Sequence, residues 1–159
     1  MKKIIYPGTF DPITNGHLDI VERAASLFDH LIITVANNPK KKSLFTVEER
    51  INLIQASINH INNVSVSSTN VLIVNFAKDN EVIALIRGLR SISDFEYEFQ
   101  MALMNRSLAS EISTIFMMPD EKYMHLNSTV VKEIAALEGD ISAYVPAIVE
   151  AQLKSKLNI

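Results

Sequence analysis

The chain has 159 residues, of which 48% are hydrophobic and 21% are charged, and its formal net charge is −3 at pH 7. These values are typical of a globular protein, and we expect residues 1–159 to form one domain around one core. The negative charge argues against a general nucleic-acid binder, so any anion site must arise from local clustering of basic side chains. The absence of cysteine excludes disulfides, thiolate catalysis and cysteine-ligated metals.

The start of the chain and its hydropathy favour a cytoplasmic protein without a membrane segment. Met1–Lys3 is basic, but the apolar run Ile4-Ile5 that follows is too short for a signal sequence. No apolar run in the sequence approaches the roughly 20 residues that span a bilayer.

The first pattern along the chain is a short apolar strand, residues 3–6, followed by a polar turn and a helix. The turn, residues 7–17, has the sequence Pro-Gly-Thr-Phe-Asp-Pro-Ile-Thr-Asn-Gly-His, and apolar residues recur at helical spacing from Leu18. Its spacing matches neither the P-loop nor the dinucleotide-binding glycine motif. Because the first N–H groups of a helix have no partner within it, such a turn can bind an anion. We therefore predict an anion site that includes Thr9 and His17.

Four more strands alternate with helices along the rest of the chain. Thr46 and Glu49 form a capping box at the start of one helix, and Ser93 and Glu96 are predicted to form another. Gly139 is expected at the C′ position of the helix before it, and Pro146 at the first position of the last helix. The further strands are predicted at 31–36, 64–67, 82–86 and 114–118, and the helices at 47–60, 74–79, 93–106, 128–138 and from 146 onward.

This alternation predicts an α/β fold with a five-stranded, mainly parallel sheet covered by helices on both faces. In such sheets, ligands bind beyond the carboxyl ends of the strands, at the topological switch point. Polar residues recur at these ends: His17 after the first strand, Lys40–Lys42 after the second, Arg87–Arg90 after the fourth and the 119–129 loop after the fifth. A chain of net negative charge thus places cations at one rim, which favours a phosphate-rich ligand.

The same residues also have structural interpretations. A lysine run is usually a solvated loop, and the negative charge of Glu98 suits the first turns of a helix. Ser128 and Thr129 would cap a helix, although a capped helix start at the sheet rim is also a phosphate site. No paired carboxylates, Ser-His-Asp arrangement or metal-ligand cluster is evident in the sequence. Donors and cations alone are what phosphoryl or nucleotidyl transfer requires, because positioning and charge stabilise its transition state.

Taken together, the motifs resemble the phosphopantetheine adenylyltransferase family of the nucleotidylyltransferase superfamily. Thr14-Asn15-Gly16-His17 matches the (H/T)-x-G-H signature of that superfamily. The resemblance extends over nearly the whole chain. Its matching segments are Tyr6–His17, Phe45–Arg50, Ile86–Arg90, Ser93–Glu98, Met104-Asn105 and Val131–Glu133.

The resemblance implies a Rossmann-like doubly wound fold, a homohexamer and an enzyme of coenzyme A synthesis. It implies transfer of an adenylyl group from ATP to 4′-phosphopantetheine, giving dephospho-coenzyme A and pyrophosphate, with Mg²⁺ arriving with ATP and no metal ligand from the protein. The attack would be direct and in line, without a covalent enzyme intermediate. Coenzyme A would be a feedback ligand, and neither nucleic acid nor a membrane would be a partner.

The resemblance also assigns roles to residues. The catalytic residues would be His17, Thr9, Lys41 and Arg90. Phosphopantetheine would contact Thr9, Lys41, Ile73, Arg87, Leu103 and Asn105. ATP would contact Thr9, Phe10, His17, Gly88, Leu89, Arg90, Glu98, Tyr123, Met124, His125, Leu126, Asn127, Ser128 and Thr129.

One segment departs from the family pattern. The ATP loop commonly ends with an aromatic residue, an isoleucine and then serines or threonine, whereas this chain has His125 and Asn127 in the corresponding segment. We also expect the pKa of His17 to lie below its ordinary value in the empty protein, because the helix dipole disfavours a positive charge there.

Two other functions stay open. A sister enzyme that transfers AMP or CMP to nicotinamide mononucleotide or glycerol phosphate would share the Gly-His signature, but the Arg87–Arg90 and Asp94–Glu98 segments argue against it. A nucleotide-sensing module without turnover is disfavoured by the intact set of donors.

Overall fold

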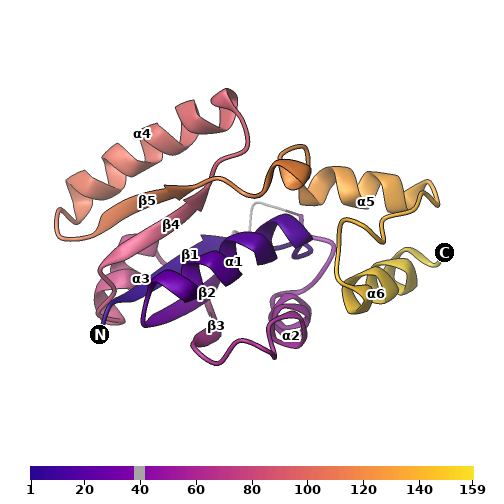
Figure 1. The fold of residues 1–159 in the computed structure, drawn as a ribbon, viewed down its shortest axis with the longest axis horizontal. Coiled ribbons are helices and arrows are strands. Elements are labelled where there is room, and N and C mark those ends of the chain that lie inside the picture. The colour runs from indigo at the N-terminus through magenta and orange to yellow at the C-terminus, as the bar shows by residue number, and fades with distance from the viewer. Residues whose placement is uncertain (38–41) are drawn as a thin grey trace.

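A computed structural model describes residues 1–37 and 42–159, in which helices alternate with the strands of one sheet (Figure 1). The strands are β1 (Lys3–Gly8), β2 (His30–Ala36), β3 (Val64–Thr69), β4 (Ala84–Gly88) and β5 (Ser113–Met117). The helices are α1 (Asn15–Leu27), α2 (Val47–Ser57), α3 (Ile73–Asp79), α4 (Ile92–Leu108), α5 (Ser128–Ala136) and α6 (Ala147–Leu157), with a 3-10 turn, η1, at Glu121–Tyr123.

The sheet is parallel throughout and has the strand order β3-β2-β1-β4-β5. The chain runs outward from β1 to β3 and then crosses to β4, so the switch point lies between β1 and β4. Right-handed crossovers place α1 and α2 on one face of the sheet and α3 and α4 on the other. In Figure 1, α4 lies along β4 and β5, while α5 lies beyond the arrowheads of these strands. The predicted Rossmann-like, doubly wound fold is confirmed.

The core is built from strands that are apolar on both faces, as a covered parallel sheet requires. Ile4, Ile5, Leu31 and Ile33 are fully buried, and Ile54 of α2 packs into the same cluster. Burial of each such side chain contributes about 1.5–3 kcal/mol. No helix in the described part of the chain is long and apolar enough to cross a bilayer.

The helix starts differ from their predicted positions. The capping box of Thr46 and Glu49 is confirmed at the start of α2, but the one predicted for Ser93 and Glu96 is wrong. Ser91 is the N-cap of α4, because its backbone is extended and its side chain accepts a hydrogen bond from the Asp94 N–H. Pro146 likewise precedes α6 as its N-cap instead of occupying the first helical position.

Gly139 does not occupy the left-handed position after α5 that the sequence predicted. That position belongs to Glu138, with φ 58°, and no described glycine has a positive φ. The Gly139 N–H bonds the Ile134 carbonyl at 2.9 Å and the Glu138 N–H bonds the Ala135 carbonyl at 2.9 Å, which is a Schellman motif. A Cβ at position 139 would lie 2.5 Å from Ile134 Cγ2. Close packing, and not a left-handed backbone, therefore accounts for this glycine.

These positions predict opposite effects for two neighbouring substitutions. Gly139→Ala should lower the free energy of unfolding by about 1–3 kcal/mol, because the new methyl group overlaps Ile134. Glu138→Gly should raise it by up to about 1 kcal/mol, because glycine adopts the left-handed region without steric cost. Urea denaturation of both variants measures the two effects, and the reverse order would place Gly139 in the left-handed position.

Candidate active site

A cavity of about 570 Å³ opens at the carboxyl ends of β1 and β4, at the switch point of the sheet. Four segments line it: the turn between β1 and α1, residues 42–43, the end of β4 with the first turns of α4, and the stretch from Pro119 to Lys132. The lining includes these predicted site residues: Thr9, Phe10, His17, Arg87, Gly88, Arg90, Glu98, Tyr123, Leu126, Asn127, Ser128 and Thr129.

The Thr14-Asn15-Gly16-His17 motif forms a capping box at the start of α1. The Thr14 side chain accepts from the His17 N–H, and His17 Nδ1 accepts from the Thr14 N–H at 3.0 Å. Histidine thus occupies the position that glutamate or glutamine takes in most capping boxes. Because Nδ1 is an acceptor, the ring proton lies on Nε2, which has no partner among the described residues. This box was not predicted, although Thr-x-x-His has its spacing.

The surroundings of His17 keep its ring neutral. Phe10 packs edge-on against it with ring centroids 5.1 Å apart, and Tyr6 lies on the same side of the cavity. Burial, with a smaller contribution from the positive charge of Arg90, lowers the pKa of His17 to about 4. The predicted direction of the pKa shift is confirmed, but its main cause is desolvation and not the expected helix dipole. A neutral imidazole here offers an Nε2–H donor without a net charge.

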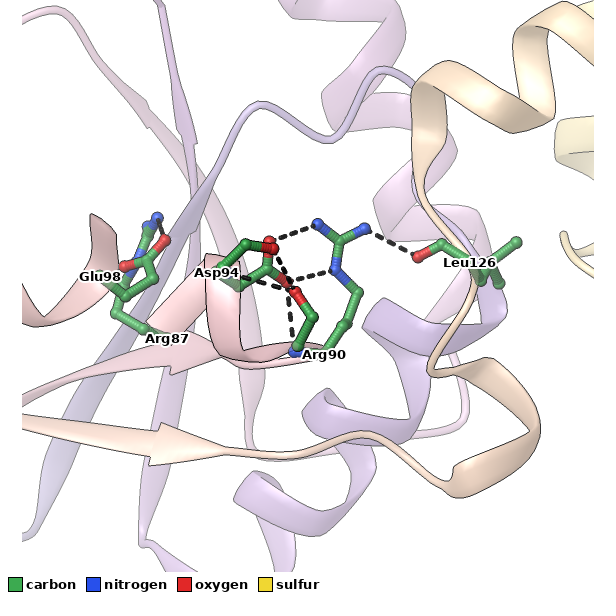
Figure 2. A network of polar contacts seen from close by, with 7 residues as sticks. Arg87, Arg90, Asp94, Glu98 and Leu126 are labelled. Carbon is green, nitrogen blue, oxygen red and sulfur yellow. Dashed lines mark hydrogen bonds and ion pairs between the residues drawn. The ribbon is translucent and has the colours of Figure 1, made fainter. Parts of the chain in front are cut away.

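Arg90 bridges the start of α4 and the 119–129 loop. Its Nε and Nη2 donate to the Asp94 carboxylate at 3.0 and 3.3 Å, and its Nη1 donates to the Leu126 carbonyl at 2.9 Å. Figure 2 shows the guanidinium between these two acceptors. The loop that was predicted to bind ATP is therefore tied to the Arg-Gly-Leu-Arg segment through one side chain.

Arg87 forms a more buried pair with Glu98, a residue that is 9% exposed (Figure 2). Arg87 Nε and Nη2 donate to the two carboxylate oxygens of Glu98 at 2.7 and 2.6 Å, and Arg87 Nη1 donates to the Pro7 carbonyl at 2.8 Å. Burial opposes the charge of Arg87, but the Glu98 carboxylate outweighs it and holds the pKa of Arg87 above its ordinary value. Glu98 therefore fixes the position of Arg87.

Both arginines retain donors for a ligand. A guanidinium has five N–H groups, and each arginine uses three of them in the bonds just described. Five minus three leaves two N–H groups on Arg87 and two on Arg90 without a partner among the described residues. Together with His17 Nε2–H, these groups can bind phosphate oxygens.

A second ion pair in the cavity wall was not predicted. Lys132 of α5 donates to Asp11 Oδ2 at 2.6 Å, and both residues line the cavity. Burial opposes the charge of Asp11, but hydrogen bonds from Lys132, Phe45 and Leu44 outweigh it and hold the pKa of Asp11 below its ordinary value. Only the presence of Asp11 and Lys132 in the family motifs could have indicated this pair, because the two residues lie 121 positions apart in the chain.

The start of α5 forms another part of the wall. Asn127 is the N-cap and accepts from the Val130 N–H at 2.8 Å, so the departure from the family pattern preserves the cap. The Ser128 hydroxyl donates to the Pro12 carbonyl at 2.7 Å, which ties α5 to the turn after β1. Thr129 also lines the cavity.

Several predicted residues do not line the cavity. The Leu89 N–H bonds the Met117 carbonyl, and the His125 ring packs against Tyr144. Leu103 is exposed on α4. Lys41 lies outside the described residues, although its neighbour Lys42 lines the cavity. Met124, Ile73 and Asn105 are the other predicted residues absent from the lining, and their assigned ligand contacts stay predictions.

Among the described residues that line the cavity, every carboxylate has a basic partner. Of its lining residues, only Asp11 and Glu98 are acidic, and both are paired with basic side chains. Across the described residues, no group of three histidine, aspartate or glutamate side chains could hold a metal. The donor set therefore fits an anionic ligand.

Comparison with known proteins identifies the family of this chain. The family described as cytidylyltransferase-like matches residues 5–134. Phosphopantetheine adenylyltransferase from Syntrophomonas wolfei is 47% identical over 157 residues, which cover 99% of this chain and 98% of that protein. The chain belongs to the phosphopantetheine adenylyltransferase family. A second member, from Hamiltonella defensa, is 48% identical over 95% of this chain and 97% of its own length.

A solved structure extends the similarity in fold beyond the family. A protein from Vibrio parahaemolyticus, named as a nicotinate-nucleotide adenylyltransferase, superimposes with a TM-score of 0.72 at 20% identity, covering 99% of this chain and 95% of that one. At this identity the comparison shows that the phosphopantetheine adenylyltransferase family shares its fold with that protein.

The low pKa of His17 predicts a pH-dependent stability. As the pH falls from about 6.5 to about 4, the unfolded chain takes up a proton at His17 before the folded chain does, so the free energy of unfolding decreases. The contribution is fully present above about pH 6.5. We therefore expect the free energy of unfolding, measured by urea denaturation, to decrease more between about pH 7 and about pH 4.5 in the wild type than in His17→Gln. The glutamine variant keeps an acceptor for the Thr14 N–H. Equal losses in the two proteins would contradict the assignment.

Proposed function

We propose that the protein transfers the adenylyl group of ATP to 4′-phosphopantetheine, producing dephospho-coenzyme A and pyrophosphate. The observation that carries the proposal is a set of donors around one cavity that have no partner among the described residues, namely His17 Nε2–H and two N–H groups each on Arg87 and Arg90. Membership of the phosphopantetheine adenylyltransferase family supports this choice of acceptor over other phosphate compounds.

The chemistry is a direct displacement at phosphorus. An oxygen of the acceptor phosphate, already ionised at neutral pH, attacks the α-phosphorus of ATP, and the bond to the bridging oxygen of the β-phosphate breaks in line with it. That oxygen leaves as part of pyrophosphate with the electron pair of the broken bond. No general base is needed, and no side chain forms a covalent intermediate.

The cavity residues stabilise the crowded, anionic transition state. Neutral His17 donates its Nε2–H to an oxygen of the α-phosphate, and its position is fixed in advance because Nδ1 is held by Thr14. Arg90 supplies positive charge to the triphosphate, while its bond to Leu126 keeps the ATP loop in place. Thr9, Lys41 and Arg87 bind the phosphate of the acceptor, so that the two phosphates meet beside His17.

Mg²⁺ would arrive bound to ATP. Magnesium is usually bound through substrate phosphates and water with one or two carboxylates, and the two carboxylates of the cavity are already paired. When bound, the metal would neutralise part of the triphosphate charge, while the residues of this chain position the phosphates. Dephospho-coenzyme A and coenzyme A, which share the pantetheine phosphate, are expected to bind in the same cavity.

We further propose that the protein acts as a cytoplasmic homohexamer. Helix α4 supports assembly, because only Glu98 is buried along its 17 residues. Its exposed side chains include Ile92, Tyr97 and Leu103, which are 82%, 62% and 54% exposed. Monomeric proteins rarely expose a contiguous apolar surface of this kind. Sedimentation velocity measures the assembly state, and a stable monomer at micromolar concentration would contradict the proposal.

A pyrophosphate-release assay tests the reaction. ATP and 4′-phosphopantetheine with Mg²⁺ should yield pyrophosphate and dephospho-coenzyme A in equal amounts. Nicotinamide mononucleotide and glycerol phosphate, tested as acceptors in parallel, should yield far less. Turnover with one of these and not with phosphopantetheine would identify a sister enzyme, and binding of ATP without any turnover would indicate a nucleotide sensor.

Substitution of His17 tests the mechanism. His17→Ala should lower kcat by at least about 100-fold and change ATP affinity only a few-fold, because the contact is made mainly in the transition state. His17→Gln, which retains the capping interaction, controls for damage to the start of α1 and should also lose most of the rate. A loss that appears only as a raised KM for ATP would make His17 a ground-state ligand.

A further inference from the structure

Asp11 joins two distant segments of the chain in the cavity wall. The residue is 4% exposed. Its Oδ1 accepts from the Phe45 N–H at 2.9 Å, and its Oδ2 accepts from the Leu44 N–H at 2.9 Å and from Lys132 Nζ at 2.6 Å. Three donors from the segment before α2 and from α5 therefore converge on one carboxylate.

Arg50 also joins the turn after β1 to the start of α2. It is 3% exposed, and its Nη1 donates to the Thr9 carbonyl at 2.8 Å while its Nε donates to the Thr46 carbonyl at 3.3 Å. The turn after β1 is thus attached to the start of α2 at two points, through Asp11 and through Arg50. Because Thr9 and Asp11 both line the cavity, this attachment sets the shape of its wall.

The ion pair with Asp11 controls where the charge of Lys132 lies. A lysine ammonium on a four-carbon stem has many rotamers, and holding one of them costs side-chain entropy. The bond to the nearly buried carboxylate selects one position, in which Lys132 is 25% exposed at its side chain and lines the cavity. Asp11 also holds the backbone next to Lys42 and Ser43, two further lining residues.

We propose that Asp11 is a positioning residue that places the Lys132 ammonium and residues 42–45 at the cavity wall to receive a diphosphate group. The inference rests on the proposed function for the identity of that group, which is the pyrophosphate portion of ATP. Asp11 itself touches no ligand, since its oxygens already accept from Lys132 and two backbone N–H groups. It acts through the groups that it holds.

Asp11 has two opposing physical effects on anion binding, and the experiment distinguishes which of them dominates. If Asp11 mainly neutralised Lys132, its removal would free positive charge and tighten anion binding. If it positions Lys132 and the 42–45 segment, its removal weakens binding. In Asp11→Asn, the amide keeps one acceptor oxygen but sets an N–H group against the donors that Asp11 now accepts.

The experiment measures binding of inorganic pyrophosphate by calorimetry to the full-length protein and its variants. Lys132→Met keeps both backbone hydrogen bonds of Asp11, so the fold should persist. The variant should bind pyrophosphate at least tenfold more weakly, which corresponds to about 1.4 kcal/mol. Asp11→Asn should cause a similar loss, and the double variant should be no weaker than the weaker single variant, because both act through one pair. Lys132→Arg should restore most of the affinity.

Lys156→Met is the matched control. Lys156 forms an equally short pair, 2.6 Å to Glu49 at the start of α2, but neither residue lines the cavity. This variant should bind pyrophosphate as the wild type does. A general loss of stability around α2 would lower the affinity of all the variants together, and that outcome would overturn the proposal.

Three other results would overturn it. These are unchanged affinity in Lys132→Met, tighter binding in Asp11→Asn, and losses in the two single variants that add in the double variant. Because pyrophosphate binding needs no turnover, the test separates the inference from the proposed function. Inactivity toward ATP and phosphopantetheine with the predicted binding pattern would refute the reaction and leave the positioning role in place.

Discussion

The hydrogen bond from the Thr14 N–H to His17 Nδ1 links the start of α1 to the chemistry of the cavity. A capping box needs an acceptor at its third helical position, and glutamate would add a negative charge beside the phosphates. Histidine supplies the acceptor while remaining neutral, and its second nitrogen becomes a donor on the cavity side. Protonation of Nδ1 would set two donors against each other, so the helix cap itself favours the neutral ring that burial also favours.

Arg87 and Lys132 are arranged in the same way relative to their acidic partners in the cavity wall. The side chains of Arg87 and Glu98 are 29% and 11% exposed, and those of Lys132 and Asp11 are 25% and 5% exposed. In each pair the carboxylate is more buried than the basic side chain. The carboxylate therefore holds the basic group in place, and the positive charge remains the more accessible of the two. A buried pair of this kind adds little to stability, because desolvation offsets much of the attraction. The contribution of these pairs is to fix the positions of the two basic side chains.

The sequence predicted most of the fold because local patterns determine it. Runs such as Leu31–Ala36 are short, apolar and β-branched, and their alternation with helices leaves few topologies for a parallel sheet. The switch point then followed, and with it the cavity that contains His17, Arg87 and Arg90. Local competition between similar signals caused the errors, since Ser91 and Ser93 both suit an N-cap and only their backbone conformations distinguish them.

The rest of the site depends on contacts that no local pattern encodes. The pairing of Asp11 with Lys132 joins residues 121 positions apart, and the bond from Arg90 to the Leu126 carbonyl joins residues 36 positions apart. Each bond connects a loop at one strand end to a loop at another, so it exists only once the sheet has brought those ends together. The sheet therefore determines which loops lie together. The carboxylates and carbonyls of these loops then determine where the positive charge of an otherwise negative chain lies.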